Sequence, residues 1–430
     1  MSLEPEEKYR VGDILRYKIP DNKELLYLKD RKLIKEVSSS LIEKLLLCSS
    51  FRSLDSHAEL IHQKTGPSGK TLQEIKNQLK ELADEGFLIK QSQVFESLTS
   101  MNAPDSGADP ILHIGVPTRD AVLSLERTLI SFIESSQKYG RNIEYLIADS
   151  SQNDAIRHEN QQILRLLKGK YDIRISYAGT DEKNLYIKEL LKENNFPEEI
   201  LRFALFDTEE VGHDSGVNRN AILLHSVGDL VLMTDNDTVC QVTNAPNFRK
   251  TLTLGSGEDP TEFSFFQDRE EMMRKISFKT EDVLAIHEEF IGKSLENCIN
   301  HYGNIHGIDI DRMSPAFLRK LNGKGGKILC TMMGIAGDVA SGSPFGYLLL
   351  KGISRERLLR SEEAYQKIIL NRHVLRKTNF PAITDGSFLM TTTVALDHRE
   401  VLPPFLPVFR NSDSVFGTTL RKCFENGYIS

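Results

Sequence analysis

The residues best placed to do chemistry in this chain are two aspartates that lie two positions apart, Asp235 and Asp237. They follow the apolar run Leu-Val-Leu-Met at residues 230–233, which predicts a buried strand. In a sheet of parallel strands, ligands bind in the crevice at the carboxyl ends of the strands. Carboxylates are the hard oxygen ligands that a divalent cation prefers, and such a cation neutralises a diphosphate. The sequence therefore predicts a metal–diphosphate site at this pair.

Two other predicted strands also end in residues suited to a ligand. The apolar run at 111–116 leads into Pro117 and Thr118, and the run at 143–148 leads into Asp149. We expect these strand ends to lie along the same sheet edge as the aspartate pair. Asp149 can accept hydrogen bonds from a base or a ribose hydroxyl, and backbone groups near Thr118 can hold a base. The three strand ends together predict a nucleotide site.

Strands and helices alternate around these residues. A helix is predicted at 121–136, and further strands at 173–177 and 203–206. Residues 241–430 are less periodic. Alternation with short connections predicts an α/β fold with a Rossmann-like, doubly wound and mostly parallel sheet.

The first 92 residues predict a separate small α+β domain with a winged-helix arrangement. Its expected elements are extended stretches at 14–19 and 25–28, helices at 38–48 and 53–63, a third helix capped by Ser68 or Thr71, and a final strand at 87–89. Residues 93–109 are rich in Ser, Asp, Gly and Pro, which is typical of a linker. We expect domains at 1–92 and 110–430.

Composition sets the broad class. The 430 residues are 40% apolar and 27% charged, as in soluble globular proteins, and the formal net charge is −7. That charge disfavours a surface built mainly for nucleic acid or anionic lipid. The five cysteines form no Cys-x-x-Cys pair, and no apolar run reaches the roughly 20 residues of a membrane span. We expect a cytoplasmic protein without a signal peptide or an integral membrane segment.

Three stretches of the chain resemble GT-A glycosyltransferases, especially those of family 2. They are HIGVPTRDAVLSLERTLISFIES at 113–135, IEYLIADSSQND at 143–154, and GVNRNAILLHSVGDLVLMTDNDT at 216–238. The resemblance implies a GT-A fold with a nucleotide-sugar half at 110–240 and an acceptor half at 241–430. It implies donor-binding roles for Pro117, Thr118, Asp149, Arg219 and Asp235, and Mn²⁺ or Mg²⁺ bound by Asp235 and Asp237.

The late stretch NSDSVFGTTLRKCFENGY at 411–428 resembles the acidic catalytic patch of the same family. By that resemblance, Asp413 is the general base that acts on the acceptor hydroxyl in inverting members. Ser412 stands where the family usually has a second acid. Many relatives continue with a metal-binding histidine, so either that ligand is absent here or the sequence is shortened.

The N-terminal stretches at 16–46 and 69–89 resemble PqqD-like domains, which recognise peptides by adding a strand at an exposed sheet edge. The combined resemblance implies an inverting, metal-dependent hexosyltransferase. It would move a sugar from a nucleotide-sugar, a UDP-sugar by preference, to a ribosomally made precursor peptide or a protein. The alternatives are a polysaccharide or lipid-linked acceptor, or a non-catalytic peptide-binding relative.

Simpler roles compete with these assignments. The aspartate pair could be a solvated turn, Arg219 a surface residue, and Asp149 or Asp413 a helix cap. The winged-helix-like domain could bind DNA. However, residues 1–90 hold 16 Lys and Arg against 15 Asp and Glu, and a helix that reads a DNA groove is normally more basic. We therefore expect no nucleic-acid partner.

Overall fold

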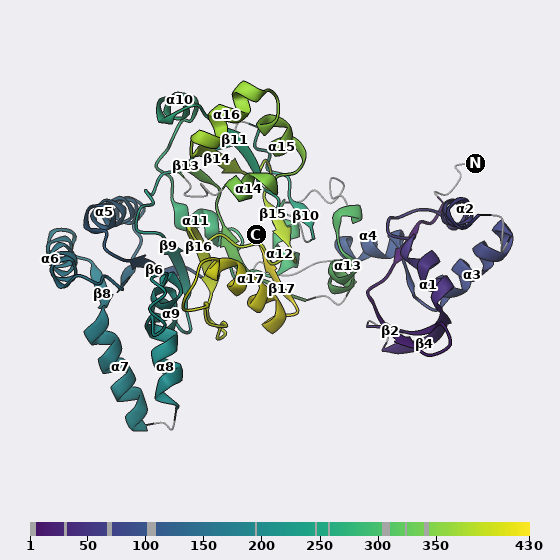
Figure 1. The fold of residues 1–430 in the computed structure, drawn as a ribbon, viewed down its shortest axis with the longest axis horizontal. Coiled ribbons are helices and arrows are strands. Elements are labelled where there is room, and N and C mark those ends of the chain that lie inside the picture. The colour runs from purple at the N-terminus through teal and green to yellow at the C-terminus, as the bar shows by residue number, and fades with distance from the viewer. Residues whose placement is uncertain are drawn as a thin grey trace. The chain divides into compact units, whose positions relative to one another are not determined.

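The computed structural model of the chain describes residues 6–29, 32–66, 71–100, 109–193, 196–245, 247–256, 259–302, 310–322, 325–338 and 344–430. The chain divides into two compact units (Figure 1). Unit 1 comprises Met1–Pro104, Leu252–Ser256 and Ser294–Gly326. Unit 2 comprises Asp105–Thr251, Gly257–Lys293 and Lys327–Ser430.

Unit 1 contains a three-stranded antiparallel sheet in the order β2-β3-β4, a second pair formed by β1 and β5, and the helices packed on them. Its strands are β1 (Tyr9–Val11), β2 (Ile14–Ile19), β3 (Lys23–Leu28), β4 (Leu33–Ser38), β5 (Leu88–Lys90) and β10 (Thr253–Gly255). Its helices are α1 (Ser39–Leu46), α2 (Leu54–Thr65), α3 (Leu72–Asp84), α4 (Gln91–Thr99), α12 (Leu295–Tyr302), η2 (Ile310–Arg312) and α13 (Pro315–Asn322).

The order of strands and helices expected for the first 90 residues is largely reproduced, with β1 and β4 in addition. The Thr71 side chain caps α3 in a capping box with Glu74, which fixes where that helix begins. Ser68, the alternative cap, lies outside the described residues. Residues 91–99 form α4 where composition suggested that a linker begins. Val94 and Leu98 are buried on one side of this helix because they are four positions apart.

A middle segment of the chain completes unit 1. The Arg10 guanidinium donates to the carbonyl oxygens of Met313 at 2.7 Å and Asp311 at 3.2 Å. Arg319 pairs with Asp13 at 3.0 Å. Segment 310–322 is thus bonded to the N-terminal elements by charged groups that lose most of their contact with water. The expected division at 92 and 110 stays a prediction.

Unit 2 holds eight strands of the large sheet, in the order β15-β17-β12-β16-β9-β6-β7-β8. These strands are β6 (Ile111–Thr118), β7 (Glu144–Asp149), β8 (Arg174–Ala178), β9 (Leu230–Thr234), β12 (Lys327–Met332), β15 (Ala382–Thr384), β16 (Thr393–Asp397) and β17 (Gly427–Ile429). The block β9-β6-β7-β8 is parallel, whereas β16 runs antiparallel to both β9 and β12. The expected α/β class with a mostly parallel sheet is confirmed.

Both faces of the sheet are covered by helices, which is why the central strands read as continuous apolar runs. On one face, buried residues of α5 (Val122–Lys138), α6 (Asp154–Tyr171) and α11 (Val283–Glu288) pack against alternate positions of β6 and β9. On the other face, residues of α9 (Ser215–His225) and α17 (Ser412–Cys423) pack against the intervening positions of β9 and against β7, β12 and β16. This arrangement fixes which end of each helix reaches the carboxyl edge of the strands.

The strand expected at 203–206 is wrong. Residues there belong to α8 (Glu198–Leu205), which forms a helical hairpin with α7 (Thr180–Glu193) that extends from unit 2 in Figure 1. Pro197 precedes the helix, Glu198 and Glu199 occupy its first turn, and Leu201 and Leu205 are four positions apart. These features favour a helix more strongly than one aromatic run favours a strand.

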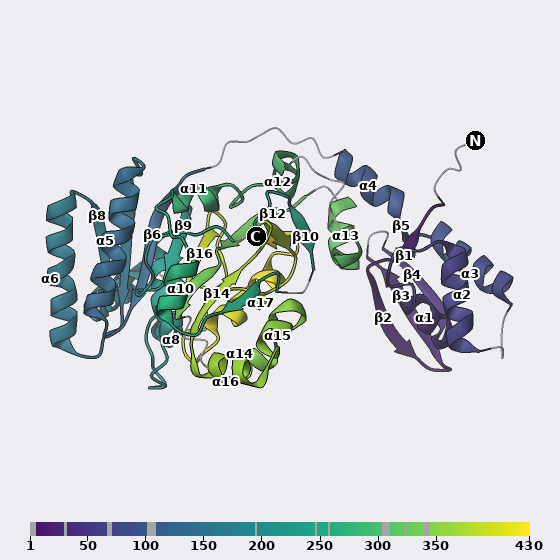
Figure 2. The ribbon, with the colours of Figure 1, turned by 90° about the horizontal axis from the view of Figure 1, so that it is seen from above.

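A smaller lobe of unit 2 is built on the antiparallel sheet β11-β14-β13 (Figure 1), and Figure 2 shows its helices α14, α15 and α16 close together. Its elements are β11 (Glu262–Phe265), β13 (Ile335–Asp338), β14 (His373–Lys377), α10 (Arg269–Lys275), α14 (Pro344–Leu348), α15 (Gly352–Leu358) and α16 (Glu362–Leu370). None of the helices in the described part of the chain combines the length and the hydropathy that a membrane-spanning helix needs.

Candidate functional site

The three strand ends singled out in the sequence meet at one edge of the sheet. Thr118 and Asp149 are register partners at the ends of β6 and β7. β9 lies on the other side of β6, with Met233 paired to Gly115, so Asp235 follows at the same edge. The roles expected for these residues remain predictions, but their side chains arise from neighbouring strand ends.

Arg219 projects from α9 to the first aspartate of the pair. Its Nη2 donates to Asp235 Oδ1 at 3.0 Å, and its Nη1 donates to Ser412 Oγ at 3.4 Å. The guanidinium also lies over the ring of Phe405, 5.8 Å from its centroid. Arg219 is only 6% exposed, which excludes the surface role considered for it. A buried guanidinium with these partners positions the aspartate that follows β9.

Asp235 is half-buried and belongs to a group of carboxylates. Burial raises its pKa, and so do the carboxylates of Asp237 and Asp413, while the Arg219 guanidinium acts in the opposite direction. Asp413, which lies 176 positions after Asp237 in the sequence, therefore acts on Asp235 from the first turn of α17. Asp235 is thus influenced by two further carboxylates and one guanidinium, and this excess of negative charge is what a bound cation would offset.

These carboxylates fit a divalent cation that takes its remaining ligands from another molecule. Among the described residues, no group of three or more His, Cys, Asp and Glu side chains could hold a metal ion. Mg²⁺ sites on phosphate substrates commonly use one or two carboxylates, and substrate oxygens and water complete the coordination. Asp235 and Asp237 supply the chemistry for that kind of site.

Two asparagines link the strand ends, and the sequence analysis assigned neither of them a role. Asn236 Nδ2 donates to Thr118 Oγ1 at 2.9 Å. Asn218 Nδ2 donates to the Thr118 carbonyl at 3.0 Å and to Ser150 Oγ at 2.9 Å. Asn218 lies in the Asn-Arg-Asn run that opens α9, where only the arginine was assigned a role. The amides hold the ends of β6, β7 and β9 in register at the candidate site.

Lys183 was not predicted as a site residue from the sequence. It is 4% exposed, and its Nζ donates to Asn218 Oδ1 at 2.8 Å. Burial lowers the pKa of Lys183 to about 8, although the carboxylates of Asp214, Asp149 and Glu182 act to raise it. No sequence signal distinguishes it from the other lysines of an amphipathic helix. The structure places a cation that titrates near neutral pH directly behind the strand ends.

Asp149 is 1% exposed and fully bonded within the protein. Its Oδ1 accepts from the Ser151 backbone at 2.7 Å, and its Oδ2 accepts from Asn160 Nδ2 and Tyr177 Oη, both at 2.9 Å. The cap of the following helix is Asn153, so the capping role considered for Asp149 is wrong. The carboxylate ties β7 to α6 and β8, and its expected contact with a nucleoside stays a prediction.

Asp413 is positioned by a segment locked against α9. Asn220 Oδ1 accepts from the Phe405 backbone N–H at 2.8 Å, and Asn220 Nδ2 donates to the Phe405 carbonyl at 3.1 Å. The Phe405 ring stacks on Phe416 of α17, with centroids 3.9 Å apart. A Cβ on Gly216 would lie 1.8 Å from the Leu406 carbonyl oxygen, so only glycine permits this approach.

The helix carrying Asp413 begins at Ser412, after Asn411 in the left-handed conformation. Asp413 therefore lies in the first turn, and the capping role considered for it is wrong because Asn411 occupies the cap position. Phe409 also has a positive φ of 74° and is 54% exposed. Bulky residues rarely adopt this conformation, and such strain concentrates at functional sites.

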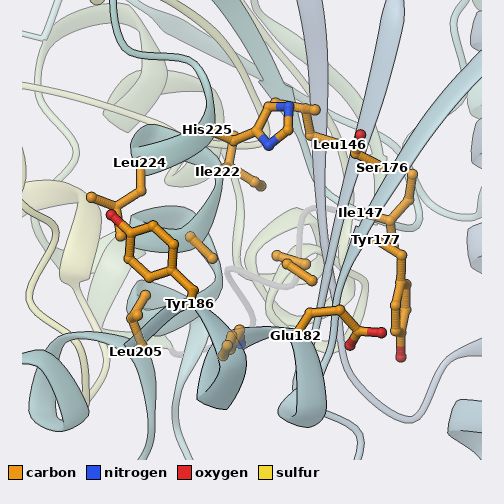
Figure 3. A pocket seen from close by; sticks show the side chains of 14 residues that line it. Leu146, Ile147, Ser176, Tyr177, Glu182, Tyr186, Leu205, Ile222, Leu224 and His225 are labelled. Atoms are coloured by element: carbon orange, nitrogen blue, oxygen red, sulfur yellow. The ribbon is translucent and has the colours of Figure 1, made fainter. Parts of the chain in front are cut away.

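A cavity of about 400 Å³ lies beside this site, between β7, β8, α7 and α9. Figure 3 shows Tyr186, His225 and Glu182 arranged around it, with Leu205 and Leu224 on the side of Tyr186. Its walls include Leu146 and Ile222, which belong to the core on the α9 face. None of the residues predicted from the sequence lines this cavity, although Lys183 does.

Comparisons with known proteins give little similarity. No family model matches the chain, and no curated protein matches it. Among solved structures, the chain is similar to the mannosyltransferase PcManGT from Pyrobaculum calidifontis, determined with GDP-Man and Mn²⁺. The identity is 14% and the TM-score 0.20, over 39% of this chain and 42% of that one. The chain thus spans less than half of that structure, and its function must be argued from the geometry of its own site.

Proposed function

We propose that unit 2 is a metal-dependent glycosyltransferase that uses a nucleotide-sugar, with a UDP-sugar as the first candidate. The observation that carries this proposal is the bond from Arg219 to Asp235, at the edge where β6, β7 and β9 end, with the Asp237 and Asp413 carboxylates acting to raise the pKa of Asp235. Sugar transfer requires a neutralised diphosphate leaving group and a base for the acceptor hydroxyl. The site offers separate groups for these two tasks.

The donor would bind across the three strand ends. Asp235 and Asp237 would hold Mn²⁺ or Mg²⁺, which offsets the charge of the diphosphate as it departs. Arg219 keeps Asp235 oriented through its 3.0 Å bond. Pro117, Thr118 and Asp149 lie where a nucleoside would extend along the edge, and the amide of Asn218 fixes the Thr118 carbonyl there.

Asp413 is the proposed base for an inverting transfer. Within the described part of the chain, Asp413 Oδ1 accepts the backbone N–H of the adjacent Ser414 at 2.9 Å, which leaves the other carboxylate oxygen to receive a proton. Ser412, in place of a second acid, binds Arg219 and Ser215 instead. These bonds of Ser412 attach the start of α17, which carries the proposed base Asp413, to Arg219 and Ser215 of α9.

For the acceptor, we propose a peptide or protein bound by unit 1. In the sheet β2-β3-β4, the described strands β2 and β4 lie at the two edges. Leu15 and Tyr17 on β2 and Ile34 on β4 are 37%, 55% and 63% exposed. An edge strand with exposed apolar side chains offers both backbone hydrogen bonds and side-chain contacts to an added strand.

The proposed activity is tested by incubating the full chain with UDP-sugars and GDP-sugars, with and without Mn²⁺, and measuring nucleotide release. We expect Mn²⁺-dependent hydrolysis that Asp237→Ala reduces by at least about 100-fold. Asp181→Ala, a change of an exposed aspartate in the first turn of α7, serves as the matched control. No metal-dependent binding or hydrolysis of any nucleotide-sugar, or full activity of Asp237→Ala, would refute the proposal.

The acceptor is tested separately, by measuring the binding of candidate precursor peptides to the full chain. Leu15→Asp/Tyr17→Asp changes the β2 edge and leaves the bonds from Arg10 to segment 310–322 in place. The pair should abolish peptide binding while nucleotide-sugar hydrolysis is unchanged. Deleting the first 92 residues is a poorer experiment because it removes the partners of that segment.

A further inference from the structure

One segment of the small lobe carries several apolar side chains that are exposed instead of packed in a hydrophobic core. Residues 348–360, which we call the leucine–arginine segment, run from the end of α14 through α15. Leu348, Leu349, Ile353 and Leu359 are 65%, 79%, 42% and 51% exposed. Ser354 and Leu358 are buried and attach α15 to the lobe, so the exposed side chains are held outward by a fixed helix.

The same segment reverses the charge of the protein. It contains Lys351, Arg355, Arg357 and Arg360 against Glu356, a net charge of +3, whereas the whole chain has −7. Arg357 pairs with Glu262 at 3.2 Å. Within the described ranges, the other three cations have no carboxylate at ion-pair distance. Cations without partners therefore alternate with exposed aliphatic side chains.

We propose that the leucine–arginine segment attaches the protein peripherally to a membrane surface rich in anionic phospholipids. Aliphatic side chains would enter the boundary between headgroups and acyl chains, and the cations would bind lipid phosphates. The exposed apolar residues here are Leu and Ile, and Tyr347 is buried. Hot spots of protein interfaces are enriched in Trp, Tyr and Arg, with Leu under-represented, and the exposed Leu and Ile here offer no aromatic anchor of that kind. Composition and charge together favour lipid over an acidic protein.

The test mixes the full chain with large vesicles and measures co-sedimentation. Vesicles of phosphatidylcholine alone are compared with vesicles that contain about one-third phosphatidylglycerol, an anionic lipid. The wild-type protein should bind the anionic vesicles at least about tenfold more tightly, and binding should weaken as salt is raised. Leu348→Ser/Leu349→Ser should lower the affinity by about tenfold or more, since two apolar contacts are lost.

A matched control also replaces two exposed leucines by serine, but on helices outside the leucine–arginine segment. Leu123→Ser/Leu166→Ser replaces side chains on α5 and α6 that are 81% and 71% exposed, and it should leave vesicle binding unchanged. A circular-dichroism melt confirms that each variant is folded. Failure of the wild-type protein to bind anionic vesicles would overturn the proposal. So would equal loss in the control, or a change of oligomeric state in Leu348→Ser/Leu349→Ser without vesicle binding, which would make the segment a contact between copies.

Discussion

Asn220 is the residue whose replacement tests most clearly how the chain that leads to Asp413, the proposed general base, is positioned. Its side-chain amide makes three hydrogen bonds: Oδ1 accepts from the Phe405 N–H at 2.8 Å, and Nδ2 donates to the carbonyls of Ala204 at 2.9 Å and Phe405 at 3.1 Å. Asn220 is 4% exposed and Phe405 fully buried. Asn220→Ala would leave these backbone groups without partners and away from water.

The size of the effect follows from that count. Each buried group left without a partner costs about 1–3 kcal/mol, and the two Phe405 groups are buried whereas the Ala204 carbonyl is only part-buried, so the free energy of unfolding should fall by about 2–6 kcal/mol. The assay is urea-induced unfolding, compared with Asn184→Ala, which removes one exposed bond from Arg202 at 3.2 Å. The control should lose less than about 0.5 kcal/mol.

The same change should also loosen the chain that leads to Asp413. At a temperature where the variant is folded, nucleotide-sugar hydrolysis should persist while transfer to the acceptor falls, because Asn220 bonds to Phe405, on the chain that leads to Asp413, whereas Asp235 is bonded by Arg219. A loss of stability below about 1 kcal/mol would refute the reasoning. So would unchanged transfer in a variant that is clearly destabilised.

Three further predictions concern residues in or behind the site. Gly216→Ala should lower the melting temperature sharply, because its Cβ would lie 1.8 Å from the Leu406 carbonyl oxygen. The control Gly169→Ala lies in α6 with open space around it, so it should raise the free energy of unfolding by about 0.5–1 kcal/mol in thermal denaturation. The pKa of Lys183 is lowered from 10.5 to about 8, so between these pH values the unfolded chain binds more protons than the folded one. The free energy of unfolding should therefore rise between pH 8 and 10.5, by on the order of 3 kcal/mol more in the wild-type protein than in Lys183→Met. Burial and the neighbouring carboxylates raise the pKa of Asp235, so calorimetry should show Mn²⁺ affinity falling as pH is lowered through its raised pKa, and a pH-independent affinity would contradict this.

The sequence predicts the framework of unit 2 well where long apolar runs end in polar residues. The runs ending at Thr118, Asp149 and Asp235 are strands at the expected places because both faces of the central sheet are buried. The run at 203–206 misled because it is short and aromatic, and the helix there is set by Pro197 and two glutamates before it. Periodicity alone does not separate a buried helix from a strand at that length.

The side chains that organise the candidate site were harder to predict. Asn218 and Asn220 donate to backbone carbonyls up to 185 positions away, and Asn236 donates to the Thr118 hydroxyl, 118 positions away. No local pattern encodes such partners. Lys183 carries no signal at all, since its burial depends on how the hairpin α7–α8 packs on α9. Segment 310–322 likewise joins unit 1 through carbonyls that any sequence would offer.

The most direct measurement of the central claim is the anomalous diffraction of crystals grown with UDP and Mn²⁺. The proposed function predicts one strong manganese peak within about 2.0–2.3 Å of a carboxylate oxygen of Asp237 or Asp235, bridged to the diphosphate, with the nucleoside extending toward Thr118 and Asp149. A peak bound elsewhere, or UDP lying in the cavity between α7 and α9 with the aspartates facing water, would contradict it.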